Sequence, residues 1–224
     1  MNDKQKAPII RIHPENPENA LLEGAADLIR SGGLVAFPTE TVYGLGADAS
    51  DSEAVRRIYA AKGRPEHNPV LVLIADRSWL TSLVADIPAC ATPLMEAFWP
   101  GPLTLAFPAA PGVDSELLGG GTTIGVRYPG ASVALRLTNT VGRPITAPSA
   151  NRSGGPPPLT AQAVADDLED RIDLILDGGP AGEAIPSTVV DVSGTAPRLV
   201  RPGRVAFEDI LKVWNHATGK TPRP

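Results

Sequence analysis

The sequence predicts a mixed α/β fold, in which helices flank a twisted sheet of parallel and antiparallel strands. Short apolar runs bounded by turn residues alternate with stretches whose apolar residues recur at helical spacing. Some neighbouring apolar runs follow each other without a helix between them, a connection that a purely parallel sheet does not allow. The 224 residues contain no internal repeat and no flexible linker, so we expect one domain over residues 1–224, with its core at about 18–204.

Amphipathic stretches define the expected helices. Asn16 followed by Pro17 is typical of an N-cap and a proline in the first helical position, and the glycine pair at 32–33 ends that first helix. Thr160 is the expected N-cap of a later helix. After the last helix, residues 218–224 are expected to form a frayed tail. The expected helices cover residues 17–31, 52–61, 78–86, 92–98, 132–142, 160–170 and 207–217.

Apolar runs define the expected strands. The most apolar of them, VLVLIA, is far too short to cross a bilayer. The run PITAPSAN is interpreted as a strand that continues into a loop. The expected strands cover residues 34–37, 70–75, 103–108, 123–128, 144–151, 173–177, 188–193 and 198–203.

Composition narrows the class of protein. A hydrophobic content of 42% is that of an ordinary globular chain, and a net charge of −5 argues against a broad nucleic-acid surface. The single cysteine, Cys90, excludes an internal disulfide and gives no support for a thiolate metal site. The first ten residues lack the apolar core of a signal peptide. We therefore expect a cytoplasmic protein with no membrane partner.

Several short motifs resemble known binding sites but lack the neighbouring strand, helix or residue spacing that those sites require. GLGADA fits the loose dinucleotide-binding pattern, but residues 38–43 separate its first glycine from the preceding strand, so the helix could not meet a pyrophosphate. GKT near the end lacks the first glycine of a phosphate-binding loop and the helix that should follow. The histidines have no metal-ligand spacing and are expected on the surface: His13, His67 and His216.

What remains is a set of polar loops at strand ends. The loop KGRPEHNP presents Lys62 and Arg64, which suit a polyphosphate or a carboxylate, although the same cations could simply complement a helix dipole. The loop APSANRSGG presents Ser149 and Asn151, although such a loop can also be a self-stabilising turn. Arg127 lies on a predicted strand, where a buried guanidinium needs an anionic partner.

Seven motifs then occur in a characteristic order: PTETVYGLG, KGRPEHNP, WPGPLT, VRYP, APSANRSG, PSTVVD and RPG. Together they resemble the threonylcarbamoyl-AMP synthase family, built on the YrdC-like domain, over residues 20–204. The resemblance implies a YrdC-like fold with a concave substrate cleft, in the single-domain form. It implies a nucleotidyltransferase that makes threonylcarbamoyl-AMP and pyrophosphate from L-threonine, bicarbonate and ATP with Mg²⁺, for threonylcarbamoyladenosine modification of tRNA next to the anticodon. The product would pass to a downstream tRNA threonylcarbamoyl transferase complex, and a weak contact with RNA itself is expected.

The resemblance also assigns roles to residues. Lys62 and Arg64 would be catalytic and would face bicarbonate and the phosphates. Threonine would be bound by Thr41, Arg127, Ala147 and Ser187. ATP would be bound by Arg64, Asn68, Thr123, Ser149, Asn151 and Arg201. No protein side chain is assigned to a metal, and the chemistry needs positioning and charge neutralisation more than acid–base groups.

Two positions depart from the family pattern. Leu73 stands where many relatives have histidine, and Pro157 stands where a hydroxyl is common, so a contact is lost or replaced at each. In FPTETVYGLG, we expect Gly44 and Gly46 to let the backbone pass close to the pocket, and Glu40 has no assigned role.

Two alternatives stay open. One is a non-catalytic double-stranded RNA-binding module in ribosome maturation, and the other is a carbamoyltransferase-type relative. Retention of the lysine, arginine, serine and asparagine positions favours the enzyme, because an RNA binder needs spread basic charge and not a compact pocket.

Overall fold

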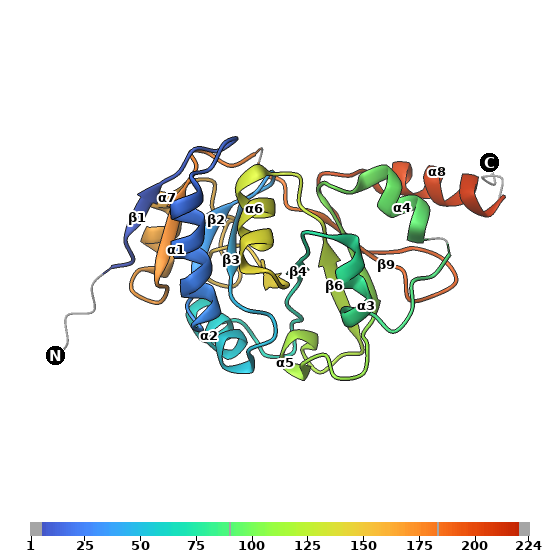
Figure 1. The fold of residues 1–224 in the computed structure, drawn as a ribbon. Coiled ribbons are helices and arrows are strands. Elements are labelled where there is room, and N and C mark those ends of the chain that lie inside the picture. The colour runs from blue at the N-terminus through green and yellow to red at the C-terminus, as the bar shows by residue number, and fades with distance from the viewer. Residues whose placement is uncertain (1–5, 90, 183, 220–224) are drawn as a thin grey trace.

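The computed structural model describes residues 6–89, 91–182 and 184–219. Their strands form two neighbouring mixed sheets, which are flanked by helices (Figure 1). The α/β class with both parallel and antiparallel pairing is confirmed. The expectation of one sheet is wrong, because the strands divide into a four-stranded and a six-stranded sheet. The expected tail at residues 220–224 lies outside the described residues, and so does Cys90.

The four-stranded sheet contains the first strands of the chain. Its order is β1–β8–β2–β3, where β1 pairs with β8 and β8 with β2 in parallel, and β2 pairs with β3 antiparallel. The bounds are β1 (Ile9–Arg11), β2 (Val35–Pro38), β3 (Tyr43–Gly46) and β8 (Leu174–Asp177). The helices around it are α1 (Asn19–Arg30), α2 (Ser52–Lys62), α6 (Ser132–Val141) and α7 (Ala161–Leu168).

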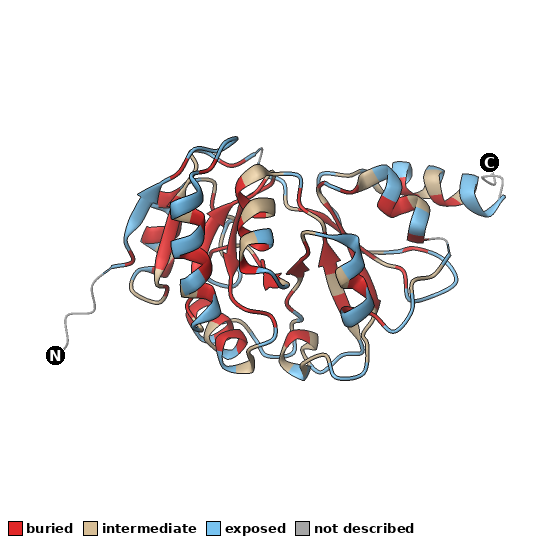
Figure 2. Ribbon diagram, in the orientation of Figure 1, coloured by how far each residue is buried: buried red, intermediate tan, exposed pale blue. Residues whose placement is uncertain are grey.

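Helices cover both faces of this sheet because successive strand residues point to opposite sides. In β2, Val35 and Phe37 join the cluster of buried residues that α1 and α6 provide. Ala36 between them joins the cluster that α2 and α7 provide. Figure 2 shows the result as buried strands enclosed by helices that are buried on one side and exposed on the other.

The six-stranded sheet has the order β10–β9–β5–β6–β4–β7. β9 pairs with β5 and β4 with β6 in parallel, and the other three pairs are antiparallel. The bounds are β4 (Val72–Leu73), β5 (Leu103–Pro108), β6 (Thr123–Arg127), β7 (Ile145–Thr146), β9 (Thr188–Asp191) and β10 (Arg198–Arg201). The remaining helices are η1 (Arg77–Trp79), α3 (Leu80–Leu83), α4 (Ala91–Phe98), α5 (Ser115–Leu118) and α8 (Phe207–Thr218).

The two sheets meet where β3 runs beside the segment that follows β7. Isolated bridges join Gly44 to Ser149 and Asp48 to Ile145. The Leu45 N–H also donates to the Pro148 carbonyl at 2.8 Å. The strand expected at 144–151 is therefore only two residues long, because the rest of that segment bridges to β3 instead of continuing a ladder and because proline supplies no N–H.

The first helix begins later than expected. α1 starts at Asn19 with Glu18 as N-cap, so the assignment of Asn16 as N-cap is wrong. The reason is local: the Nδ1 atom of His13 accepts the N–H of Asn16 at 3.0 Å, which holds that residue in a preceding turn. The expected cap at Thr160 is confirmed, since its hydroxyl accepts the N–H of Ala163.

The helix expected at 78–86 is also shorter than predicted. It consists of the 3₁₀ turn η1 and the four-residue α3. It ends because the Ala85 N–H donates to the Pro108 carbonyl at 2.9 Å and Val84 forms a bridge with Ala109. Pairing with the end of β5 thus replaces helical hydrogen bonds.

The glycines of FPTETVYGLG lie on the buried strand β3 and do not line a pocket, so that expectation is wrong. A Cβ atom on Gly46 would come within 2.7 Å of the Phe37 ring, so Gly46 makes room for a core aromatic side chain. A Cβ atom on Gly44 would lie 3.5 Å from the same ring, which is an ordinary van der Waals contact.

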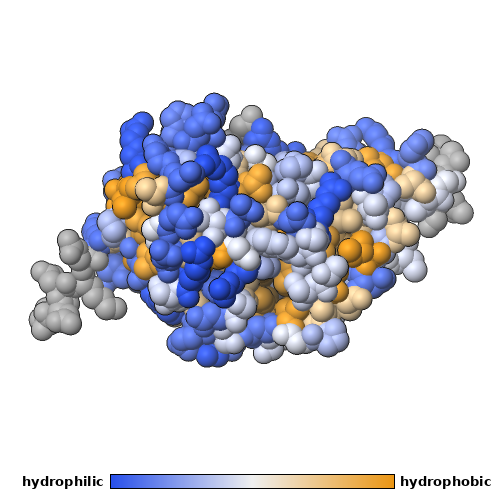
Figure 3. Space-filling view, viewed as in Figure 1, coloured by the Kyte–Doolittle hydropathy of each residue, from blue (hydrophilic) through white to orange (hydrophobic). Residues whose placement is uncertain are grey.

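The surface has the character of an ordinary globular chain. Figure 3 shows a predominantly hydrophilic face with scattered apolar side chains. His13, His67 and His216 are all exposed, as expected. None of the helices in the described ranges is long and apolar enough to cross a membrane.

Candidate functional site

A pocket of about 490 Å³ lies over one face of the six-stranded sheet, next to the junction between the sheets. Its lining residues on β5, β6 and β9 are two apart, which is the spacing that puts side chains on the same face of a sheet. The four-stranded sheet contributes the loop between β2 and β3. The lining includes Thr41, Arg64, Leu71, Thr104, Ala106, Thr123, Gly125, Arg127, Ala147, Ser149, Pro157, Pro186, Ser187, Val189, Asp191, Arg198 and Arg201.

Most of the residues predicted for the site line this one pocket. Those that do are Thr41, Arg64, Thr123, Arg127, Ala147, Ser149, Ser187 and Arg201. Three do not line it: Lys62, Asn68 and Asn151. Of the two departures, Pro157 faces the pocket, whereas Leu73 is fully buried in the core on β4.

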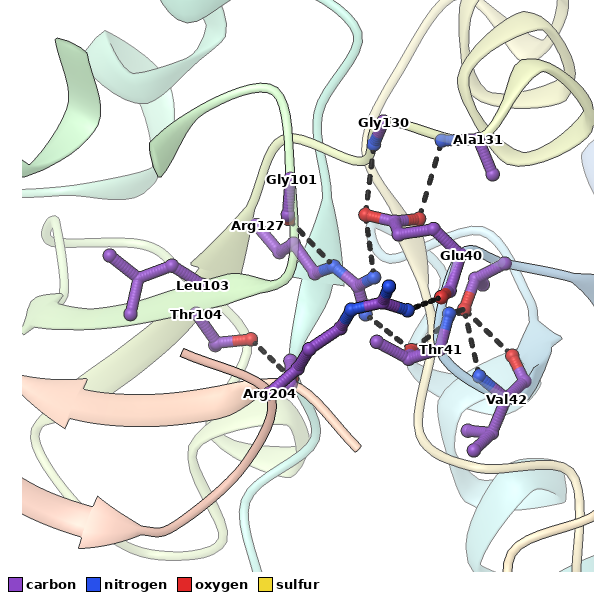
Figure 4. Close-up of polar contacts among 12 residues, drawn as sticks. Glu40, Thr41, Val42, Gly101, Leu103, Thr104, Arg127, Gly130, Ala131 and Arg204 are labelled. Atoms are coloured by element: carbon purple, nitrogen blue, oxygen red, sulfur yellow. Dashed lines mark hydrogen bonds and ion pairs between the residues drawn. The ribbon is translucent and has the colours of Figure 1, made fainter. Parts of the chain in front are cut away.

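Arg127 is the most deeply buried cation that faces the pocket, with 4% of its surface exposed. Nε donates to the Gly101 carbonyl and Nη1 donates to Thr41 Oγ1, both at 3.2 Å. Nη2 forms an ion pair with Glu40 Oε1 at 2.8 Å (Figure 4). Nε and Nη1 each donate one hydrogen bond, whereas Nη2 makes no hydrogen bond within the described part of the chain and contacts Glu40 only as an ion pair. Each terminal nitrogen of the guanidinium therefore keeps at least one N–H group for a carboxylate.

The hydroxyl of Thr41 lies between Arg127 and Thr39. It accepts a hydrogen bond from Arg127 Nη1 at 3.2 Å. Thr39 Oγ1 lies 2.9 Å from it, donates to the Val42 carbonyl at 2.7 Å and accepts the N–H groups of Thr41 and Val42 at 3.1 and 3.3 Å. Thr41 Oγ1 keeps a second lone pair, which it can offer to a donor such as an amine or a hydroxyl.

Glu40 is the functional residue that sequence reasoning missed. Besides its ion pair with Arg127, its carboxylate accepts the N–H of Gly130 at 2.9 Å and the N–H of Ala131, the N-cap of α6, at 3.3 Å. Burial alone would raise the pKa of Glu40, but the charge of Arg127 and the N–H of Gly130 outweigh it and the pKa is lowered. No local sequence pattern indicates these contacts of Glu40, because Arg127, Gly130 and Ala131 are all distant from it in the sequence.

Arg201 enters the pocket from β10 and is held by Ser187. Its Nη2 donates to the Ser187 carbonyl at 2.8 Å and to the Ser187 hydroxyl at 3.1 Å, and Thr104 Oγ1 lies 2.9 Å from the same hydroxyl. Desolvation, followed by repulsion from Arg127 and Arg64, lowers the pKa of Arg201. The glycine of the RPG motif is required by packing: a Cβ on Gly203 would lie 2.4 Å from backbone atoms of residues 186–188.

Arg64 follows α2 and is positioned by the backbone of its own loop. Its Nε donates to the Asn68 carbonyl at 3.2 Å and its Nη2 to the Pro69 carbonyl at 3.0 Å. Asn68 thus contributes through its backbone, which also accepts the hydroxyl of Tyr59 at 2.9 Å. Burial lowers the pKa of Arg64.

Lys62 lies beneath the pocket and holds one of its loops. Lys62 is only 2% exposed, and its ammonium donates to the carbonyls of Ser149 and Asn151 at 2.5 and 2.6 Å. Burial and then repulsion from Arg64 lower its pKa to about 8. The Asn151 amide donates to the carbonyls of Arg152 and Gly155, both at 2.8 Å, so this residue also shapes the loop.

The charge balance defines what the pocket can bind. Arg198 is neutralised by Asp191 at 2.7 Å, and Arg127 by Glu40. Within the described part of the chain, no carboxylate forms an ion pair with Arg64 or Arg201. Nor does that part hold three or more histidine, cysteine or acidic side chains placed to bind a metal ion. The pocket therefore suits a ligand with several anionic groups.

The fold and the pocket define an α/β protein with a cationic pocket over one face of its six-stranded sheet, next to the junction with the four-stranded sheet. The Sua5/YciO/YrdC family model, described as telomere recombination, matches residues 27–203. The chain belongs to this family, which confirms the family predicted from its motifs.

Individual relatives carry more specific names. The threonylcarbamoyl-AMP synthase of Pyrococcus abyssi (strain GE5 / Orsay) is 49% identical over 189 residues, which are 84% of this chain and 56% of the relative. The putative threonylcarbamoyl-AMP synthase of Mycobacterium tuberculosis (strain ATCC 25618 / H37Rv) is 41% identical over 200 residues, 89% of this chain and 91% of the relative. The crystal structure of P. abyssi Sua5 complexed with L-threonine has a TM-score of 0.89 at 47% identity and covers 92% of this chain and 61% of that chain. This chain thus spans little more than half the length of the P. abyssi protein.

Proposed function

We propose that this protein is a threonylcarbamoyl-AMP synthase, which converts L-threonine, bicarbonate and MgATP into threonylcarbamoyl-AMP and pyrophosphate. The observation that carries the proposal is Arg127, a buried guanidinium with an N–H group left on each terminal nitrogen. It shares the pocket with Arg64 and Arg201, neither of which has an ion-pair partner among the residues that the structure describes. One substrate must then offer a carboxylate and the other must offer several negative charges. Relatives named for this activity and a similar structure complexed with L-threonine support that choice.

In this proposal the threonine subsite lies between the sheets. Arg127 binds the substrate carboxylate in a bidentate manner, and Thr41 Oγ1 accepts a hydrogen bond from the amine or the hydroxyl of threonine. Ser187 lines the same pocket. Ala147 would contribute its carbonyl, because its N–H already donates to the Leu71 carbonyl at 3.0 Å.

The nucleotide subsite follows from the remaining cations. Arg64 and Arg201 would bind the phosphates, and Thr123 and Ser149 offer hydroxyls in the same pocket. We assign Lys62, Asn68 and Asn151 to the support of this subsite and not to its surface, which refines the expectation that Lys62 is catalytic. Mg²⁺ would arrive as part of the MgATP substrate, because the only carboxylate in the pocket lining, Asp191, is already occupied by Arg198.

The reaction needs little acid–base chemistry from the protein. The amine of threonine and bicarbonate form a carbamate with loss of water, and a carbamate oxygen attacks the α-phosphorus of ATP while the bond to pyrophosphate breaks. Negative charge on the departing pyrophosphate is stabilised by fixed cations, and the reacting atoms are aligned by the two subsites. The product would serve a transferase that modifies tRNA, and direct contact of this protein with RNA stays a prediction.

The experiment is threonine-dependent release of pyrophosphate from ATP, with Mg²⁺ and bicarbonate present and labelled threonine followed into threonylcarbamoyl-AMP. Arg127→Met should lower kcat/KM for threonine by about a hundredfold, as expected for the loss of one partner of a buried charged hydrogen-bonded pair. Arg143→Met is the matched control, since Arg143 is also paired with a buried acid, Asp48 at 3.0 Å, but does not line the pocket. Absence of threonine-dependent release from the wild type would contradict the proposal.

A further inference from the structure

The contacts around Glu40 tie together three parts of the chain that are distant in sequence. Glu40 lies in the loop between β2 and β3, its ion-pair partner Arg127 ends β6, and its N–H partners Gly130 and Ala131 precede α6. Its backbone carbonyl also accepts a hydrogen bond from Arg204 at 3.1 Å. Figure 4 shows the carboxylate between Arg127 on one side and the two backbone N–H groups on the other.

The carboxylate is built into this place and cannot easily turn away. Its side chain is 20% exposed, and both oxygens are used, Oε1 by Arg127 and Gly130 and Oε2 by Ala131. Glu40 does not line the pocket, whereas Arg127 does. Any effect of Glu40 on a ligand must therefore pass through the arginine.

We propose that Glu40 is a positioning residue for substrate binding: it fixes the guanidinium of Arg127 so that two N–H groups face the carboxylate of the amino-acid substrate. The inference rests on the proposed function. Arg127 is held by hydrogen bonds to Gly101 and Thr41 and by its ion pair with Glu40, and of these three contacts only Glu40 supplies a compensating charge. Without that charge the guanidinium faces repulsion from Arg201 and loses one of its three fixed contacts.

The effect should be selective for one substrate. Arg127 contacts Thr41 directly, on the threonine side of the pocket, whereas Arg64 is held by its own loop. Loss of Glu40 should thus weaken threonine binding and leave ATP binding nearly unchanged. A purely structural defect would lower the fraction of active enzyme, which reduces kcat and leaves both KM values as they were.

The test uses Glu40→Gln, which keeps the size of the side chain and an oxygen for the N–H groups but removes the charge. We expect the KM for threonine to rise at least about tenfold, since misplacement of a positioning group by about 1 Å can cost about a hundredfold. The KM for ATP should change less than about twofold. Asp48→Asn is the matched control: Asp48 is a buried acid paired with an arginine outside the pocket, so both KM values should stay the same.

A double-mutant cycle separates action through Arg127 from any other route. In the Arg127→Met background, threonine binding measured by calorimetry should not weaken further when Glu40→Gln is added. Equal changes in both KM values, an unchanged KM for threonine, or full additivity in the cycle would each overturn the inference. If the wild type turns over threonine and Glu40→Gln has the same KM values, only the inference about Glu40 is wrong. If the wild type is inactive, the proposed function is wrong as well.

Discussion

Replacing Lys62 with methionine separates support of the pocket from the stability of the fold. Methionine preserves most of the apolar stem but removes an ammonium that is buried and donates to two carbonyls, those of Ser149 and Asn151. These carbonyls belong to the loop that contributes Ser149 to the pocket lining. The variant should therefore disturb the nucleotide subsite without removing a residue that touches the ligand.

The stability change is the difference between two opposing terms. Burial lowers the pKa of Lys62 from 10.5 to about 8, which corresponds to about 3 kcal/mol of cost for the charged form at neutral pH. Methionine removes that cost. It also leaves two buried carbonyls without a donor, at about 1–3 kcal/mol each. Because the terms largely cancel, we expect the free energy of unfolding to change by less than about 3 kcal/mol.

The turnover change should be much larger than the stability change. Displacement of a positioning group by about 1 Å can cost about a hundredfold in rate, and Lys62→Met should displace the loop that presents Ser149 to the nucleotide. Urea unfolding and pyrophosphate release measure the two quantities on the same preparation. Lys212→Met is the matched control, because Lys212 pairs with Asp209 on the exposed face of α8 and should affect neither quantity.

Either of two results would refute this reasoning. Normal turnover would show that the loop is held correctly without the ammonium. A loss of more than about 5 kcal/mol in unfolding free energy would show that the charge is not costly where it lies, because the roughly 3 kcal/mol regained on removing a costly charge would keep the net loss below that value.

Three further predictions follow from the same geometry. Between about pH 8 and 10.5, Lys62 is protonated in the unfolded chain but has lost its proton in the native state, so the free energy of unfolding should rise with pH. In Lys62→Met, the slope of unfolding free energy against pH should be smaller. Identical slopes for the two proteins in urea titrations would contradict the lowered pKa. Arg64→Ala should abolish pyrophosphate release while the circular dichroism spectrum stays native, and unchanged turnover would show that the phosphate site lies elsewhere. Gly203→Ala should lower the unfolding free energy by about 1–3 kcal/mol because its Cβ would overlap the backbone of residues 186–188; an unaltered Tm in calorimetry would show that this backbone yields.

Local features of the fold could be predicted from the sequence because their causes are local. The cap at Thr160 and the apolar periodicity of α8 depend on residues within one or two turns. The division into two sheets could not be predicted, since it depends on where the segment after β7 finds its partner. That segment has the composition of a strand, yet Ser149 bridges to β3 and ends the ladder. Strand pairing over such distances leaves no trace in local periodicity.

The site shows the same limit. The cations and hydroxyls that face the pocket lie in loops marked by glycine and proline, and the ordered motifs identified most of them. Glu40 was missed, and Lys62 was assigned to the pocket surface, because each acts on a partner more than eighty residues away. From sequence alone, a lysine that binds a ligand and a lysine that holds a loop look the same.

The charges of the pocket connect its stability to its function. Arg64 and Arg201 have no ion-pair partner in the described part of the chain. Burial lowers the pKa of Arg64, and burial followed by repulsion from Arg127 and Arg64 lowers the pKa of Arg201. The free protein therefore keeps cations in an unfavourable setting, and Glu40 neutralises only Arg127. A polyanionic ligand relieves the remaining repulsion when it binds, and it stabilises the native state by an amount that grows with the logarithm of the ligand concentration above Kd. In the proposed reaction, the charge that destabilises the empty pocket is also the charge that stabilises the departing pyrophosphate.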